Sequence, residues 1–122
     1  MATGHRITIT PSDVHVEVMV GGERVAASDR PVLLDETGLP TRYYLPPEDI
    51  RTDLLRPSSR TSRCPFKGEA SYWSVEVDGK DYEDVAWSYE QPIPGAGGIA
   101  GLICFYPERV EIRVDRSGAG VT

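Results

Sequence analysis

The sequence predicts a mainly β protein, a compact single domain of two antiparallel sheets with one short helix. Twelve Gly and ten Pro residues among 122 indicate many turns and short elements. Val14, Val16, Val18 and Val20 alternate with other residues, which is the period of a strand with one buried face. Asp78-Gly79 separates two runs rich in aromatic and β-branched residues and indicates a hairpin.

Short strands are expected throughout the first third of the chain. Residues 1–12 are expected to be a polar terminus that is loose until Ile7 or Ile9, and the domain is expected to span residues 13–115. Gly21-Gly22 turns the first strand back on itself as a hairpin. The strands expected here are Val14–Val20, Arg24–Ala27, Pro31–Asp35 and Arg42–Leu45.

The one helix is expected over Pro47–Leu55. Pro47 suits the first helical position, and the acids at 48 and 49 favour the positive end of the helix dipole. Pro57 disfavours helical geometry in the residue before it, so the helix is expected to end near Leu55. Residues 57–63 are then expected to form a polar loop.

The rest of the chain is expected to return to strands. Trp73 and Trp87 are predicted on neighbouring antiparallel strands, although direct opposition of the two rings needs a register slip or a bulge. A Pro- and Gly-rich connection follows at 91–98, with one helical turn at 99–101, and residues 116–122 are a loose tail. The strands expected here are Glu69–Val77, Lys80–Tyr89, Leu102–Tyr106 and Val110–Val114.

Charge and composition limit the classes of partner. A net charge of −6 argues against nucleic-acid binding, which depends on clustered Lys and Arg. Residues 42–67 nevertheless hold six basic against three acidic residues, which suggests either a small anionic ligand or local pairing with surface carboxylates. No apolar run approaches the roughly 18 residues of a membrane span, and none resembles a signal peptide. We expect no membrane association.

Cysteine and histidine usage predicts a cytoplasmic protein with no metal and no cofactor. The two cysteines, Cys64 and Cys104, form no Cys-x-x-Cys pair and are expected to be free thiols. Two histidines, with His5 in the expected N-terminal tail, make a four-ligand zinc site unexpected.

Cys64 is the best candidate for a catalytic residue. Arg60, Arg63 and Lys67 are close to it in sequence, and nearby cations favour the nucleophilic thiolate. The alternative is a small buried residue where a loop meets a strand, because free Cys is among the most buried residue types. Cys104 lies inside an apolar run and is expected in the core.

Five blocks have the spacing of a known family: Tyr43-Tyr44-x-Pro46-x-x-Asp49, Cys64-Pro65-Phe66-Lys67-Gly68, Ala70-x-Tyr72-Trp73, Trp87-Ser88-Tyr89-x-x-Pro92 and Phe105-Tyr106. The sequence resembles the small domain of unknown function numbered 427, which also carries a nucleotidyltransferase label. The resemblance covers about Val14 to Val114. It implies a compact β-rich domain of the tent-like kind and implies little about activity. The residues do not support the transferase label, since they lack the acidic and Gly-rich features of nucleotidyl transfer.

The expected function is binding of a small flat or anionic molecule in a cleft beside the Cys-Pro-Phe-Lys-Gly segment. Arg60 and Lys67 would neutralise the anion, and Tyr72 or Trp73 would stack on it. The expected ligand-binding residues are Tyr44, Asp49, Arg51, Arg60, Cys64, Lys67, Tyr72 and Trp73. Two alternatives stay open: an enzyme using nucleotidyl transfer or Cys64 as nucleophile, and a structural or protein-interaction module. The sequence leaves the oligomeric state open.

Overall fold

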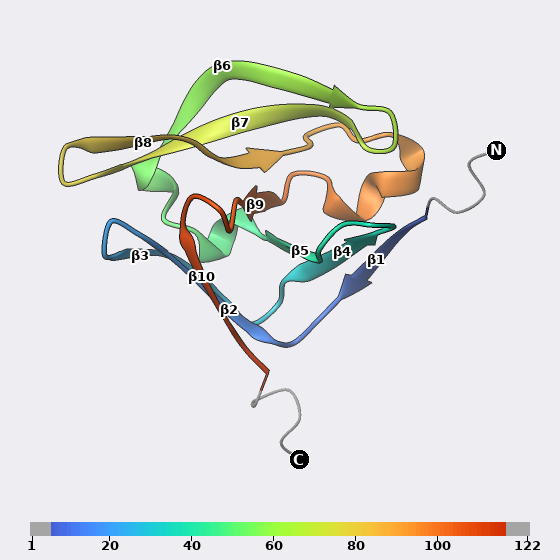
Figure 1. Ribbon diagram of the computed structural model, residues 1–122, viewed down its shortest axis with the longest axis horizontal. Helices are drawn as coiled ribbons and strands as arrows, with labels where there is room; N and C mark the ends of the chain where they lie inside the picture. The colour runs from blue at the N-terminus through green and yellow to red at the C-terminus, as the bar shows by residue number, and fades with distance from the viewer. Residues whose placement is uncertain (1–5, 117–122) are drawn as a thin grey trace.

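The computed structural model describes residues 6–116, and within them the chain forms ten strands in two antiparallel sheets (Figure 1). The mainly β class with two antiparallel sheets is therefore confirmed. The larger sheet has the strand order β1-β4-β5-β9-β8-β7-β6, and the smaller has the order β10-β2-β3. The strands are β1 (Ile7–Pro11), β2 (His15–Val20), β3 (Glu23–Ser28), β4 (Val32–Glu36), β5 (Arg42–Leu45), β6 (Leu55–Cys64), β7 (Gly68–Val77), β8 (Lys80–Ser88), β9 (Ile103–Phe105) and β10 (Glu111–Asp115).

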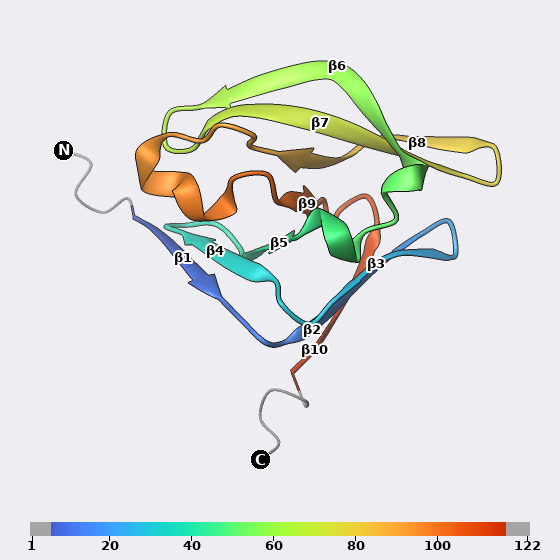
Figure 2. The same cartoon turned by 180° about the vertical axis from the view of Figure 1, so that it is seen from behind.

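The seven-stranded sheet curls across the molecule. Both views show β6, β7 and β8 on one side and β1, β4 and β5 on the other, with the orange 3-10 segment η3 (Pro94–Ile99) beside β1 at one end (Figures 1 and 2). The curl gives this sheet an outer and an inner face, and each face has its own apolar cluster.

The first cluster lies between the two sheets. Val16, Val18 and Val20 of β2 are fully buried, as their alternation predicts, because every second side chain of a strand points to the same face. They pack with Leu45, Ile103 and Phe105 of the larger sheet. Burial of each such side chain contributes about 1.5–3 kcal/mol relative to exposure, so this contact is the main attachment of the smaller sheet.

The second cluster lies on the other face of the seven-stranded sheet and follows one row of the register. Tyr44 of β5 pairs with Cys104 of β9, Cys104 with Trp87 of β8, and Trp87 with Tyr72 of β7. Directly opposite residues project to the same face, so the row places three aromatic rings side by side. Ile99 of η3 is buried against this cluster.

The N-terminal boundary differs from the expectation. Ile7 to Pro11, expected within a loose segment, form β1 and pair with β4, with Ile9 opposite Leu34. The apolar side chains of Ile7 and Ile9 pack on the second cluster. The polar residues around them give this segment the composition of a loose terminus, so the sequence does not indicate the strand. At the other end, Arg116 Nη2 donates a hydrogen bond to the Tyr43 hydroxyl at 2.9 Å. The remaining expectations for loose termini concern 1–5 and 117–122, outside the described residues.

The helix expected over Pro47–Leu55 is present as two one-turn 3-10 helices, η1 (Pro47–Asp49) and η2 (Thr52–Leu54). The segment between them is drawn to β3. Ile50 makes an isolated bridge with Ala26, and Arg51 N donates to Val25 O at 2.8 Å. The helix begins at Pro47 as expected, but the tertiary hydrogen bonds to β3 interrupt it after Asp49.

The polar loop expected over residues 57–63 is wrong, because these residues belong to the ten-residue strand β6. The strand lies at the edge of the sheet and pairs on one side with β7, with a register shift between Pro57 and Thr61. An edge strand with few buried side chains needs no apolar alternation, so its sequence looks like a loop. Pro57 is tolerated at an edge because its missing N–H removes no essential bond.

The hairpin between the two tryptophan-bearing strands is confirmed. Asp78 and Gly79 have φ values of 52° and 77°, the left-handed pair of a tight two-residue turn. Trp87 is opposite Tyr72 and Trp73 is opposite Ala86, with a register shift between Trp73 and Val75. The two tryptophans are therefore on neighbouring strands but on opposite faces of the sheet.

Candidate functional site

A pocket lies against the second cluster and is lined by residues from both strands and turns. Its volume is about 160 Å³. Strands β4, β5, β7 and β8 supply its walls, and the turns after β4 and β6 supply its rim. The residues that line it are Leu34, Glu36, Leu39, Pro40, Arg42, Tyr44, Lys67, Tyr72, Trp87, Tyr89 and Tyr106.

Aromatic rings make up much of the wall. The Trp87 and Tyr106 ring centroids are 4.3 Å apart, and Tyr72 stacks nearly parallel to Tyr106 with an interplanar angle of 12°. Trp87 Nε1 donates a hydrogen bond to the Tyr44 hydroxyl at 3.0 Å, which fixes both rings. The wall is therefore rigid, flat and suited to contact with a planar group.

Two cations and one carboxylate line the same pocket. Lys67 Nζ forms a 2.5 Å ion pair with Glu36 Oε1, and these side chains are only 12% and 8% exposed. Arg42 is different: among the described residues its Nη1 is the buried side-chain nitrogen or oxygen without a hydrogen-bond partner. The nearest carboxylate oxygen, Glu108 Oε1, is 3.9 Å from that nitrogen and belongs to a side chain that is 65% exposed.

Burial keeps the tyrosine hydroxyls of the pocket protonated. Removal from water raises the pKa of Tyr44 far above its ordinary value of 10, despite the hydrogen bond from Trp87. Burial likewise raises the pKa of Tyr89, and it raises the pKa of Tyr106 to about 12. At neutral pH these hydroxyls are neutral donors. Together with the Arg42 guanidinium, they make the pocket rich in hydrogen-bond donors.

The structure brings four of the eight expected site residues to this place. Tyr44, Lys67 and Tyr72 line the pocket. Arg60 does not line it, but its Cζ lies 4.6 Å from the centroid of the Tyr72 ring, on which it stacks. Arg60 also approaches Asp84 Oδ2 at 3.9 Å, so part of its charge is already compensated.

Trp73 is not part of the pocket. It follows Tyr72 in β7, and successive side chains of a strand point to opposite faces. Its ring packs on the cluster between the sheets, and its Nε1 donates to Ser88 Oγ at 3.0 Å.

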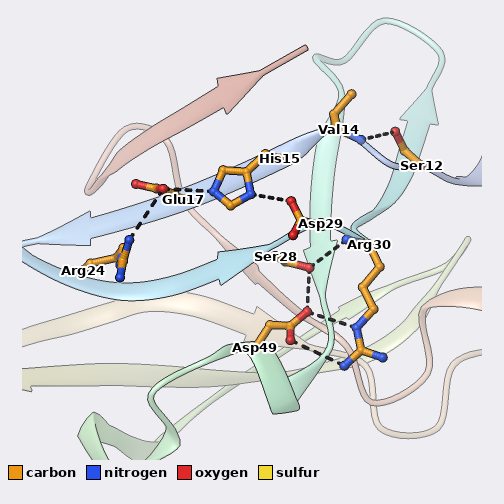
Figure 3. A network of polar contacts seen from close by, with 9 residues as sticks. All are labelled: Ser12, Val14, His15, Glu17, Arg24, Ser28, Asp29, Arg30 and Asp49. Atoms are coloured by element: carbon orange, nitrogen blue, oxygen red, sulfur yellow. Dashed lines mark hydrogen bonds and ion pairs between the residues drawn. The ribbon is translucent and has the colours of Figure 1, made fainter. Parts of the chain in front are cut away.

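Asp49 and Arg51 lie beside β3, where they stabilise the fold. Asp49 accepts hydrogen bonds from Ser28 Oγ at 2.7 Å and from Arg30 Nε at 3.1 Å (Figure 3). The Arg30 guanidinium holds the pKa of the Asp49 carboxyl below its usual value. Arg51 makes a two-point contact with Asp53 at 3.0 and 2.9 Å. Both charges are therefore engaged with neighbours in the chain.

Cys64 lies at the end of β6, half-buried against the second cluster. Two of the three cations near it in sequence contact other partners, Lys67 the Glu36 carboxylate and Arg60 the Tyr72 ring. A nucleophilic thiol also needs a base, and the described histidine, His15, has both ring nitrogens in contact with carboxylates, Asp29 at 2.6 Å and Glu17 at 2.9 Å (Figure 3). This arrangement is that of a packing residue at a strand end.

Sequence reasoning missed five chemically important members of the pocket, namely Glu36, Arg42, Trp87, Tyr89 and Tyr106. Arg42 was counted only as part of a charge excess, although its i, i+2 spacing to Tyr44 puts both side chains on one face of β5. Tyr89 and Tyr106 follow β8 and β9 directly, and the two strands are neighbours in the sheet. Because β8 and β9 are antiparallel, with Ser88 opposite Ile103 and Ala86 opposite Phe105, the two tyrosines follow opposite ends of the pair, and no local pattern assigns both to one pocket.

Residues 6–116 contain no group of three or more His, Cys, Asp or Glu side chains gathered closely enough to hold a metal ion. They also contain no helix that is long and apolar enough to cross a membrane.

Comparison with protein families gives a match that covers most of the chain. The family model described as a domain of unknown function (DUF427), with a nucleotidyltransferase label, matches residues 8–116. The match begins within β1 and includes all the pocket residues. No curated protein matches the chain.

Proposed function

We propose that this chain, which belongs to the DUF427 family of domains of unknown function, binds a small organic anion in the pocket between β4, β5, β7 and β8. Arg42 provides the positive charge, the tyrosine hydroxyls donate hydrogen bonds, and Trp87 with Tyr106 contacts the flat part of the ligand. The proposed role is binding, and the proposed location is the cytoplasm, where the free thiols Cys64 and Cys104 would stay reduced.

The observation that carries the proposal is the buried Nη1 of Arg42 without a hydrogen-bond partner. A buried polar group with no partner costs about 1–3 kcal/mol, and more when it is charged. An oxygen of a bound anion removes that cost and adds a charge-assisted hydrogen bond. Trp87 holds the guanidinium at 5.3 Å from its ring centroid, so the donor is already positioned before a ligand arrives.

The test is a thermal-shift screen of small carboxylates, sulfonates and phosphates at low salt, followed by isothermal titration calorimetry. A ligand that binds only the folded state stabilises it by RT ln(1 + L/Kd), where L is the free ligand concentration, so the melting temperature rises as the ligand concentration exceeds Kd. Arg42→Gln should weaken binding of any hit by at least about tenfold, or about 1.4 kcal/mol. Arg113→Gln is the matched control, because it removes one charge from an exposed arginine on β10 that is paired with Glu111.

A second readout uses the placement of the two tryptophans. In a Trp73→Phe background Trp87 is the one remaining tryptophan, and it lines the pocket. Binding should then change the tryptophan emission, and the Kd from the fluorescence titration should equal the Kd from calorimetry. Equal affinities of the wild type and Arg42→Gln, or a screen without any hit, would contradict the proposal.

A further inference from the structure

We infer that the anion is a planar monocarboxylate on an aromatic or apolar body about one ring in size, and that Glu36 discriminates against phosphates. The inference deepens the proposed function and rests on it, since it concerns the same pocket. Three properties of the lining lead to it: its charge, its size and the geometry of its donors.

The charges that line the pocket leave one net positive charge. Lys67 is compensated by Glu36 at 2.5 Å, inside the protein. Within residues 6–116, the carboxylate paired with Arg42 is that of the exposed Glu108, at 3.9 Å from Nη1, and Glu108 does not line the pocket. A monoanion neutralises this single charge. A dianion leaves an excess negative charge near Glu36, in surroundings where charge interactions are weakly screened.

The volume limits the part of a ligand that enters. A cavity of roughly 150 Å³ takes a benzene molecule, and this pocket has about 160 Å³. The apolar residues Leu34, Leu39 and Pro40 line the pocket together with the aromatic side chains, so a ring that enters it meets mostly carbon surface. Leu39 is 55% exposed at the rim, where a longer body would leave the pocket over it.

The donors match a carboxylate. A guanidinium binds the two oxygens of a carboxylate in a planar fork, and Arg42 supplies a guanidinium with an unused N–H. The Tyr44 hydroxyl accepts from Trp87, and its own proton remains for a ligand oxygen because burial raises the pKa of Tyr44. A tetrahedral phosphate presents a third oxygen outside the plane of this fork, in a pocket that the Glu36 carboxylate also lines.

The experiment titrates the wild-type protein with three probes that share one ring: benzoate, benzamide and phenyl phosphate. At pH 8 phenyl phosphate is a dianion, benzoate is a monoanion and benzamide is neutral. We expect benzoate to bind at least about tenfold more tightly than either of the others, because only benzoate matches both the fork and the single net charge.

The matched variant is Glu36→Gln, which keeps the side-chain shape and an oxygen that can accept from Lys67. It raises the net charge of the pocket lining by one, so the preference for benzoate over phenyl phosphate should fall by at least about tenfold. Circular dichroism and thermal melting establish that the variant is folded. If the variant does not fold, the comparison of the three probes on the wild-type protein still tests the inference.

The outcomes separate the two proposals. If none of the three probes nor any other small anion binds, the proposed function fails and this inference fails with it. If phenyl phosphate binds the wild type as tightly as benzoate, the monocarboxylate inference is overturned while anion binding stands. Equal binding of benzamide and benzoate likewise overturns it, because the negative charge is then irrelevant. An unchanged preference in folded Glu36→Gln overturns the role of Glu36.

Discussion

Arg42 and Lys67 bring the same charge to one pocket but have different partners. Lys67 is paired at 2.5 Å with a carboxylate as buried as itself, so its charge is already used within the protein. The Arg42 guanidinium lies over Trp87, and its buried Nη1 lacks a hydrogen-bond partner among the described residues. Counting basic residues along the sequence could not separate them. Only the partner of each side chain identifies the charge that is free to bind a ligand.

The two cysteines should differ in reactivity for reasons of access. Cys104 is 1% exposed, and burial raises the pKa of its thiol to about 12, so the thiolate is almost absent at neutral pH. Cys64 is half-buried at the end of β6. Iodoacetamide at pH 7.5 should therefore modify Cys64 in the folded protein and Cys104 only on global unfolding, as peptide mass spectrometry can follow.

The denatured protein in urea is the control for this labelling, because both thiols are then open. Equal protection of Cys64 and Cys104 in the native state would contradict the expected difference. It would also remove the remaining support for the nucleophile alternative.

At the scale of elements, the turn between β6 and β7 fixes one side of the pocket. Lys67 N donates to Cys64 O at 3.2 Å, and Ile93 N donates to Lys67 O at 2.9 Å. Gly68 closes the turn with φ of 118°, and a Cβ there would lie 3.3 Å from both Ile93 N and Pro92 Cα. Its backbone conformation and this close approach both require glycine.

Gly68→Ala should therefore destabilise the protein by more than about 1 kcal/mol in urea denaturation. Gly79→Ala is the matched control, because Gly79 also has a positive φ but would place its Cβ in open space. The control isolates backbone strain, so the larger loss is expected at Gly68. Equal losses of unfolding free energy in the two variants would mean that the close approach of residue 68 to the 91–93 segment does not contribute to stability.

Elements with a buried face were predictable, and elements without one were not. The alternating valines of β2 and the turn at Asp78-Gly79 have local signals that agree with their tertiary contacts. β6 and the 47–55 segment depend on hydrogen bonds to β7 and β3, which no local pattern contains. The same reason limited prediction of the site. The family-like sequence blocks contain Tyr44, Lys67 and Tyr72. Glu36 lies in none of these blocks, and its contact in the pocket is with Lys67, 31 positions away in the sequence.

At the scale of the whole molecule, two ionic contacts make the free energy of unfolding depend on pH, one at the alkaline and one at the acid end of the range. His15 lies between Glu17 and Asp29, and its hydrogen bonds to these carboxylates, that to Glu17 first, raise its pKa above 6.5 (Figure 3). The pKa of Asp49 lies below 3.8, chiefly because of its hydrogen bond with Arg30. These contacts connect β2, the segment after β3 and η1.

The last prediction follows from these directions. Because the folded state favours charged His15, its contribution is fully present below pH 6.5, the unfolded value, and is lost as pH rises through the raised folded pKa. The Asp49 contribution is present above pH 3.8 and is lost as pH falls through the lowered folded pKa. Between these limits both contacts act. Urea denaturation should show the wild type losing more stability than His15→Gln between pH 5.5 and 8.5, since general charge repulsion from a net charge of −6 affects both proteins alike. Asp49→Asn should reduce the loss of stability only at acid pH, where the wild type loses the Asp49 contribution. Parallel curves for the wild type and His15→Gln across this range would show that the His15 contacts contribute nothing to folding.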